Sequence, residues 1–189
     1  MRVDYITNSI FNSRTYILSG EGSDGVWLVD CGDVEPMLAN VAGRKIVGVL
    51  LTHAHFDHIY GLPELLKHFP EVPIYTNEWG KQALANDRWN MSRYHEQSVV
   101  VDNADIRILK EGDIIELGEE NLEVIETPGH NPSCLCYISK DCIFTVDAHI
   151  PGTPVVTNLP KCDKALALAS EQRIIQLAQG KKIYPGHSV

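Results

Sequence analysis

The chain has 189 residues, 44% of them hydrophobic and 22% charged, which suits one domain with a substantial core over residues 1–189. A net charge of −9 disfavours nucleic acid and anionic membrane surfaces as partners. No apolar run approaches the roughly 20 residues of a membrane span, no signal-peptide pattern opens the chain, and five cysteines make a poor disulfide framework, so we expect a cytoplasmic protein.

Short segments rich in Val, Ile and Tyr predict strands in the first half of the chain. These strands are expected over 2–6, 15–19, 26–30, 46–51 and 73–76. Apolar residues at helical spacing predict a helix over 59–69, and Asn77 is expected to cap a helix over 77–85. The segment 86–98 has no clear period, so we expect either a covering loop or the rim of a pocket.

The second half repeats this alternation of strands and helix. Strands are expected over 106–109, 114–117, 122–126, 135–138, 143–146 and 182–184, with a helix over 164–179. Strands bounded by helices at both ends predict two sheets packed face to face with helices outside, a four-layer αββα sandwich.

The strand over 46–51 runs directly into a dense group of candidate metal ligands. His53, His55, Asp57 and His58 fall within six residues. Imidazoles and a carboxylate on a short loop suit a transition metal. A polar turn, or capping of the following helix, is the alternative interpretation.

Three further candidate ligands stand just after predicted strands. His130 follows the strand over 122–126, Asp147 follows 143–146, and His187 follows 182–184. Buried strands fix the loops at their ends, and those loops present polar side chains. The pattern therefore predicts one metal site at one edge of the sandwich.

At these positions the chain resembles the metallo-β-lactamase fold superfamily, and within it the glyoxalase II-like hydrolases. The motifs that carry the resemblance are T-H-A-H-F-D-H at 52–58, T-P-G-H at 127–130, V-D-A at 146–148 and Y-P-G-H at 184–187. The resemblance implies two mixed sheets, and a first metal held by His53, His55 and His130. It also implies a second metal held by Asp57, His58 and His187, with Asp147 bridging the two.

Two divalent ions in this arrangement imply a hydrolase that attacks a thioester, ester or lactone with an activated water. Hydroxyacylglutathione is one candidate substrate, Asp57 is the expected catalytic residue, and zinc is favoured over iron or manganese. The expected partner is a small-molecule substrate; the oligomeric state is not predicted.

Three other functions stay open. The same resemblance includes iron dioxygenases that act on persulfides, whose ligands would be His53, His130 and Asp147. A β-lactam hydrolase and a non-enzymatic, metal-stabilised interaction module are the others. Nuclease activity is disfavoured by the acidic composition.

The chain also departs from the glyoxalase II pattern. No segment matches the added helical domain that helps those enzymes bind glutathione, and the residues after His130 are altered at Asn131, Ser133 and Cys134. Asp30, after the strand over 26–30, is expected to support the metal ligands. Among the other histidines, His95 and His149 are candidates for positions near the site, and His68 is expected on the surface.

Overall fold

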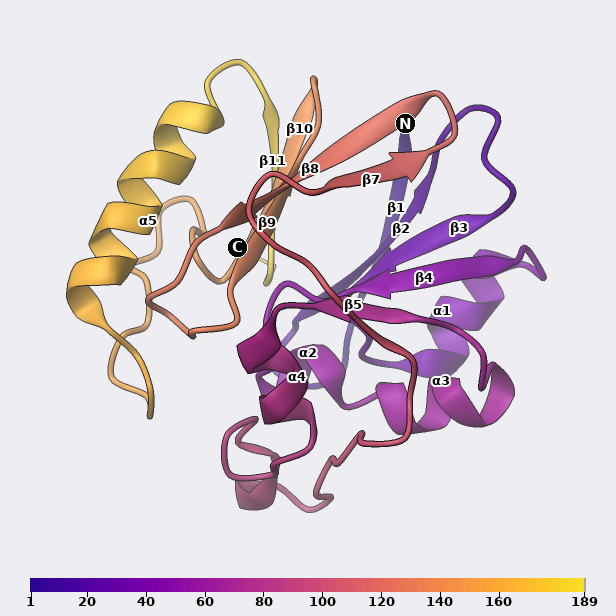
Figure 1. Ribbon diagram of the computed structural model, residues 1–189, viewed down its shortest axis with the longest axis horizontal. Helices are drawn as coiled ribbons and strands as arrows, with labels where there is room; N and C mark the ends of the chain where they lie inside the picture. Colours follow the sequence, from indigo (N-terminus) through magenta and orange to yellow (C-terminus); the bar gives the residue numbers. More distant parts are fainter. Residues whose placement is uncertain (189) are drawn as a thin grey trace.

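A computed structural model of the protein describes residues 1–188, and its strands form two sheets that face each other (Figure 1). The first sheet has six strands in the order β1-β2-β3-β4-β5-β6. Its strands are β1 (Arg2–Thr7), β2 (Arg14–Ser19), β3 (Val26–Val29), β4 (Ile46–Leu50), β5 (Ile74–Thr76) and β6 (Ile106–Ile108). The first three pair antiparallel and the last four pair parallel, so the sheet is mixed.

The second sheet has five strands in the order β11-β10-β9-β8-β7. Its strands are β7 (Ile114–Leu117), β8 (Glu120–Glu126), β9 (Leu135–Ile138), β10 (Cys142–Val146) and β11 (Lys182–Pro185). Only β11 pairs parallel with its neighbour, because α5 (Lys164–Leu177) lies between β10 and β11 in the chain and makes a crossover connection.

Three apolar clusters separate the four layers. The cluster between the sheets contains Tyr16, Leu50, Leu122, Tyr137 and Phe144. The cluster under the helices of the first sheet contains Ile17, Leu28, Met37, Leu62 and Leu65, and the one under α5 contains Ile125, Cys136, Ile143, Ile174 and Ala178. Neighbouring residues of one strand thus enter different clusters, as Tyr16 and Ile17 do, because side chains alternate across a strand. The predicted αββα sandwich of two mixed sheets is confirmed.

Four short helices cover the first sheet. They are α1 (Val34–Val41), α2 (Phe56–Ile59), α3 (Leu62–His68) and α4 (Glu78–Leu84), and a 3₁₀ turn, Ser92–Tyr94, follows them. The Asn77 side chain accepts the Gly80 N–H at 2.8 Å, so the predicted cap of α4 is confirmed.

One helix was not predicted, and one predicted helix needs correction. No element was assigned between 30 and 46, and α1 forms there with Val34, Met37 and Val41 buried at helical spacing. We also expected one helix over 59–69, whereas α2 and α3 are separate and the metal-ligand motif itself forms the first turn. Pro36 in α1 is tolerated because the first turn of a helix needs no backbone N–H.

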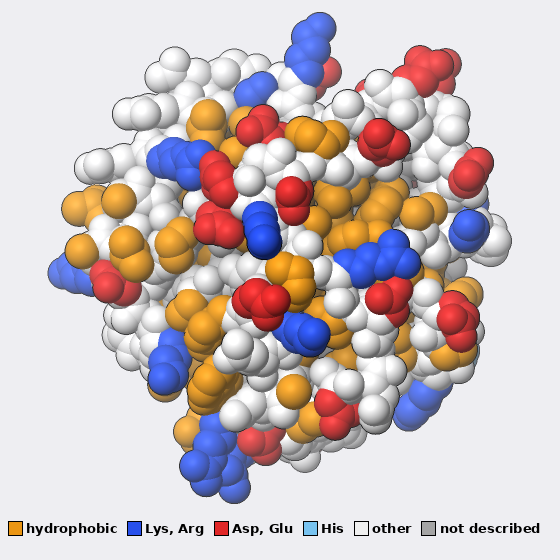
Figure 2. Space-filling model, viewed as in Figure 1, with side chains coloured by type: hydrophobic (Ala, Val, Ile, Leu, Met, Phe, Trp, Pro, Cys, Tyr) orange, Lys and Arg blue, Asp and Glu red, His pale blue; other side chains and the backbone are white. Residues whose placement is uncertain are grey.

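The surface carries charges of both signs. On the face drawn in Figure 2, acidic and basic side chains are interspersed, with apolar patches between them. No helix among residues 1–188 has the length and apolar composition that a membrane span needs.

Candidate metal centre

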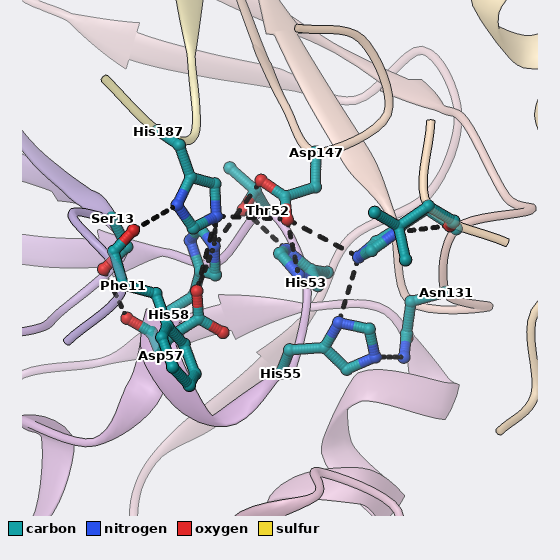
Figure 3. A network of polar contacts seen from close by, with 12 residues as sticks. Phe11, Ser13, Thr52, His53, His55, Asp57, His58, Asn131, Asp147 and His187 are labelled. Atoms are coloured by element: carbon teal, nitrogen blue, oxygen red, sulfur yellow. Dashed lines mark hydrogen bonds and ion pairs between the residues drawn. The ribbon is translucent and has the colours of Figure 1, made fainter. Parts of the chain in front are cut away.

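All seven predicted ligands lie at one edge of the sandwich, on the loops or the short helix α2 that follow four strands. Figure 3 shows how His53, His55, Asp57, His58, Asp147 and His187 lie toward one another. The cluster His53–His58 follows β4, His130 follows β8, Asp147 follows β10, and His187 follows β11. Their ligand atoms form three overlapping groups, within each of which all atoms lie within 4.8 Å of one another. The sequence separation of these residues is large, so the sheet pairing is what brings them together.

The first group consists of His53, His55 and His130, all buried. Nε2 of His130 lies 3.0 Å from Nδ1 of His55. Nε2 of His53 lies 4.0 Å from Asp147 Oδ2. The inner nitrogens are therefore Nε2 of two rings and Nδ1 of the third.

The second group consists of Asp57, His58 and His187. Asp57 Oδ2 lies 3.3 Å from His58 Nε2 and 3.4 Å from His187 Nε2. The two imidazole Nε2 atoms are 3.3 Å apart. Two nitrogens and one carboxylate oxygen thus converge on one point beside the first group.

Asp147 contacts both groups. Its Oδ2 lies 3.6 Å from His130 Nε2 and 3.3 Å from His187 Nε2, and its Oδ1 lies 3.6 Å from His58 Nε2. The preceding residue, Val146, has φ of 42°, which is a strained conformation for a β-branched side chain. The pairing of β10 with β11 also shifts between Phe144 and Val146. The chain is bent at this point, and the bend turns the Asp147 carboxylate into the cluster.

Two buried atoms of the cluster have no hydrogen-bond partner, Nε2 of His53 and Oδ1 of Asp147. A buried polar atom without a partner is costly, so native proteins pair nearly all of them. Both atoms point at the convergence of nitrogen and carboxylate donors that transition metals prefer. The residues therefore fit divalent metal ions.

Asp30 supports the cluster as expected. It is 1% exposed, its Oδ1 accepts the Thr52 N–H at 2.8 Å, and its Oδ2 accepts the Thr52 hydroxyl at 2.7 Å and His58 Nδ1–H at 2.9 Å. Thr52, which the sequence analysis did not single out, thereby ties the end of β4 to the end of β3. The carboxylate fixes the His58 ring, with Nε2 directed into the cluster.

Burial dominates the protonation of the first group. Burial, followed by the neighbouring His58, lowers the pKa of His53 well below its ordinary value. Burial and the neighbouring His130 lower the pKa of His55 to about 3. Both rings are therefore neutral at pH 7 and keep a lone pair for a metal.

Carboxylates dominate the pKa values of the histidines in the second group. Burial alone lowers the pKa of His58, but Asp57, Asp147 and Asp30 outweigh it and raise that pKa well above its ordinary value. Burial lowers the pKa of His187, but the hydrogen bond and charge of Asp147 together with the Phe11 carbonyl outweigh it, so that pKa is raised as well. In return His58 lowers the pKa of Asp57 and of Asp147, against the effect of burial. These carboxylates are ionised at pH 7.

Metal binding is therefore expected to release protons from the second group. His58 and His187 hold protons to a higher pH than ordinary imidazoles, and a metal ligand must be unprotonated, so affinity should fall as the pH drops through their raised pKa values. We expect about two protons to be released per chain on zinc binding at pH 7. Calorimetry in buffers of different ionisation enthalpy measures this number. His187→Ala should release about one proton fewer, and equal release in both proteins would contradict the assignment.

Gly129 shapes the turn before His130. Its φ is +136°, and an added Cβ would lie 2.1 Å from the Ala167 backbone nitrogen in α5. We expect Gly129→Ala to lower the free energy of unfolding by about 3 kcal/mol, from backbone strain and overlap together. Gly152→Ala is the matched control, because Gly152 has φ of +79° with open space around it. Urea unfolding of both variants tests this, and equal losses would contradict it.

A cavity of about 540 Å³ opens beside the second group. Phe11 lines it, and the Phe11 carbonyl accepts His187 Nδ1–H at 3.0 Å. Phe56 and His95 line it as well, with their rings stacked at 4.1 Å. The segment 86–98 thus contributes His95 to the rim of this cavity, although none of the seven candidate ligands lines it.

The other candidate residues have different roles. His149 turns away from the ligands and pairs with Glu171 of α5 at 3.2 Å, and His68 is exposed as expected. The five cysteines are all unpaired. Asn131, noted only as a departure from the family pattern, is fully buried and contacts His55 Nε2 at 2.9 Å. Its position directly after His130 was the available sequence signal.

Comparisons with known proteins find relatives in sequence and in fold. A hydroxyacylglutathione hydrolase of Hahella chejuensis is 35% identical over 130 residues, which are 67% of this chain and 42% of that protein. The crystal structure of the B3 metallo-beta-lactamase BLEG-1 superposes with a TM-score of 0.88 at 24% identity, covering 100% of this chain and 92% of the other. The protein TTHA1623, crystallised in a di-iron-bound form, superposes with a TM-score of 0.84 at 26% identity, covering 99% and 93%.

The curated hydrolases are longer than this chain, which spans only 42% of the Hahella protein and 41% of a Yersinia enterocolitica homologue. The sequence model of the Metallo-beta-lactamase superfamily matches residues 11–187. That match contains all seven ligand positions and both sheets from the loop before β2 onward. The chain therefore belongs to the metallo-beta-lactamase superfamily.

Proposed function

We propose that the protein is a dinuclear metal-dependent hydrolase that cleaves a thioester, ester or lactone of a small molecule. His53, His55 and His130 hold the first ion, and Asp57, His58 and His187 hold the second. Zinc is the expected metal at both positions, with iron and manganese as alternatives.

The position of Asp147 carries this proposal. One oxygen of its carboxylate lies 3.6 Å from His130 of the first group and 3.3 Å from His187 of the second. A carboxylate shared in this way suits two ions at the separation of about 3.5–4 Å that is typical of two-metal hydrolases. Oδ1 of the same carboxylate is buried without a partner, which is consistent with a ligand to an ion.

The bound ions would supply Lewis acidity and lower the pKa of a water to roughly 7. Asp57 faces the same space, with its carboxylate held by His58 and His187 and its pKa lowered. An ionised carboxylate there can orient the attacking water and accept its proton. The Ser13 hydroxyl donates to the Asp57 carbonyl at 2.7 Å and so fixes the backbone of this residue.

The cavity beside the second group supports a substrate with an apolar part. Phe11, Phe56, Tyr60 and His95 contribute aromatic surface to it. The name of the Hahella relative supports a thioester of glutathione as one candidate. Because this chain spans less than half of that protein, we place simple acyl thioesters and lactones beside it as equal candidates.

One alternative function has support of its own. His53, His130 and Asp147 also converge, with Asp147 Oδ2 at 4.0 and 3.6 Å from the two Nε2 atoms. Two imidazoles and one carboxylate are the ligand set of mononuclear iron oxygenases, and TTHA1623 was crystallised with iron, in a di-iron form. A persulfide dioxygenase is therefore the second candidate.

Metal analysis combined with a substrate panel separates the two. Protein purified without added metal is analysed for metal content and then assayed with zinc, manganese or iron on thioesters, lactones, β-lactams and a persulfide. Two metals per chain with thioester or lactone cleavage are the expected result. One iron per chain with oxygen consumption would refute the hydrolase proposal in favour of the dioxygenase.

A further inference from the structure

The outer nitrogens of the five clustered imidazoles differ in their hydrogen-bond partners. In three rings Nδ1 contacts an oxygen that can only accept: Asp30 Oδ2 for His58 at 2.9 Å, the Val156 carbonyl for His130 at 2.9 Å, and the Phe11 carbonyl for His187 at 3.0 Å. Nδ1 of each ring therefore carries a proton, and Nε2 is the nitrogen that faces the cluster.

His53 follows the same pattern through Thr52. Its Nδ1 lies 3.2 Å from Thr52 Oγ1, and that hydroxyl already donates its proton to Asp30 Oδ2 at 2.7 Å. The hydroxyl oxygen can then only accept from His53 Nδ1–H. His53 Nε2 is left with a free lone pair, as a metal ligand requires.

His55 is the exception. Its outer nitrogen is Nε2, and that atom lies 2.9 Å from the amide nitrogen Nδ2 of Asn131. The amide end of an asparagine is a donor. His55 Nε2 must therefore accept, which places the ring proton on Nδ1, the nitrogen that faces the cluster.

The orientation of the Asn131 amide is fixed by its other end. Asn131 Oδ1 accepts the Ser133 backbone N–H at 2.9 Å and the Ser133 hydroxyl at 2.6 Å. A backbone N–H is an obligatory donor. Turning the amide over would set the Nδ2 donor against it, so the hydrogen-bond network selects the orientation with Nδ2 toward His55.

The consequence reaches a second ligand. With the proton on Nδ1, His55 donates to His130 Nε2, 3.0 Å away. The inner nitrogens of both rings are then occupied by one hydrogen bond between them. A metal at the first position has to displace this proton to Nε2 of His55, where the Asn131 amide opposes it.

We propose that Asn131 is a positioning residue: it holds the His55 proton on Nδ1, the nitrogen that faces the cluster, whereas the other four rings carry that proton on their outer nitrogen, and it thereby weakens the first metal position. This inference rests on the metal centre proposed above. Replacing the donor by an acceptor should reverse the effect, because a carboxylate accepts His55 Nε2–H and still accepts the Ser133 N–H.

The tautomer is measured directly in metal-free protein. Long-range proton–nitrogen correlation spectra of histidine-labelled protein distinguish Nδ1–H from Nε2–H rings. We expect His55 as Nδ1–H in the wild type and as Nε2–H in Asn131→Asp. A wild-type His55 with its proton on Nε2 would overturn the proposal, whatever the variants do.

Zinc affinity is the second measurement. A His187→Ala background removes a ligand of the second position, so that competition with a chromophoric chelator reports the first position. In that background Asn131→Asp should bind zinc about 10- to 100-fold more tightly. Asn131→Ser keeps an acceptor for the Ser133 N–H and removes the opposing donor, so it should also tighten binding, by a smaller factor.

Asn12→Asp is the matched control for charge. Asn12 is exposed on the loop that carries Phe11, so the substitution adds the same carboxylate without touching His55. Equal tightening by Asn12→Asp and Asn131→Asp, or weaker binding in both Asn131 variants, would overturn the proposal. Neither measurement uses turnover. If the His55 tautomer and the zinc affinity change as expected but the protein cleaves no substrate of the panel, the hydrolase proposal is refuted and the role of Asn131 stands.

Discussion

Asp57→Ala is expected to lower kcat for the cleaved thioester or lactone by about 10³-fold or more, because it removes a metal ligand and a proton acceptor together. Asp57 lies in the first turn of α2 at the surface of the packed sandwich, and its side chain is 13% exposed. Its loss should therefore leave the circular dichroism spectrum and the sheet core unchanged.

Two further variants sharpen this test. Asp102→Ala removes a carboxylate from an exposed position outside the cluster and should keep full activity. Asp57→Asn keeps an oxygen ligand but loses the proton acceptor, so metal content near that of the wild type with low turnover would separate the two roles. Near-normal turnover in Asp57→Ala would refute the role assigned to Asp57.

The convergence of the candidate ligands could be predicted because each of them lies just after a strand. The segments that end at Leu50, Glu126 and Val146 are rich enough in Val, Ile and Leu to predict strands. Polar residues beyond such strands are held at the sheet edge whatever the loop conformation. The expected strand ends were therefore correct to within about two residues, and the seven ligands converge.

Other features depended on contacts that no local pattern contains. Val146 is a strong strand former, yet its φ of 42° bends the chain so that Asp147 enters the cluster. In the sequence Asn131 is typical of a turn. Its contact with His55, 76 positions away, depends on the packing of β4 and β8 in the folded protein. The α1 helix had a local signal in Val34, Met37 and Val41, but Pro36 and its short length obscured it.

The removal of Asp30 is expected to have the largest effect on stability. This carboxylate is 1% exposed, and it alone accepts the Thr52 N–H, the Thr52 hydroxyl and His58 Nδ1–H. Asp30→Ala leaves a buried backbone N–H and a buried imidazole with a raised pKa without their acceptor. Breaking a buried pair in this way costs about 3–5 kcal/mol, so urea unfolding of the metal-free protein should show a loss of that size.

Thr52→Val is the matched control, since it removes only the hydroxyl donor to Asp30 and should cost about 1 kcal/mol. Asp30→Asn tests the same carboxylate without a cavity. Its amide cannot accept from both Thr52 N–H and His58 Nδ1–H, so one end opposes its neighbour. If the opposed neighbour is His58, its proton moves to Nε2 and the second metal position weakens by about 10- to 100-fold. If Asp30→Ala loses less free energy of unfolding than Thr52→Val does, Asp30 does not hold the ends of β3 and β4 together.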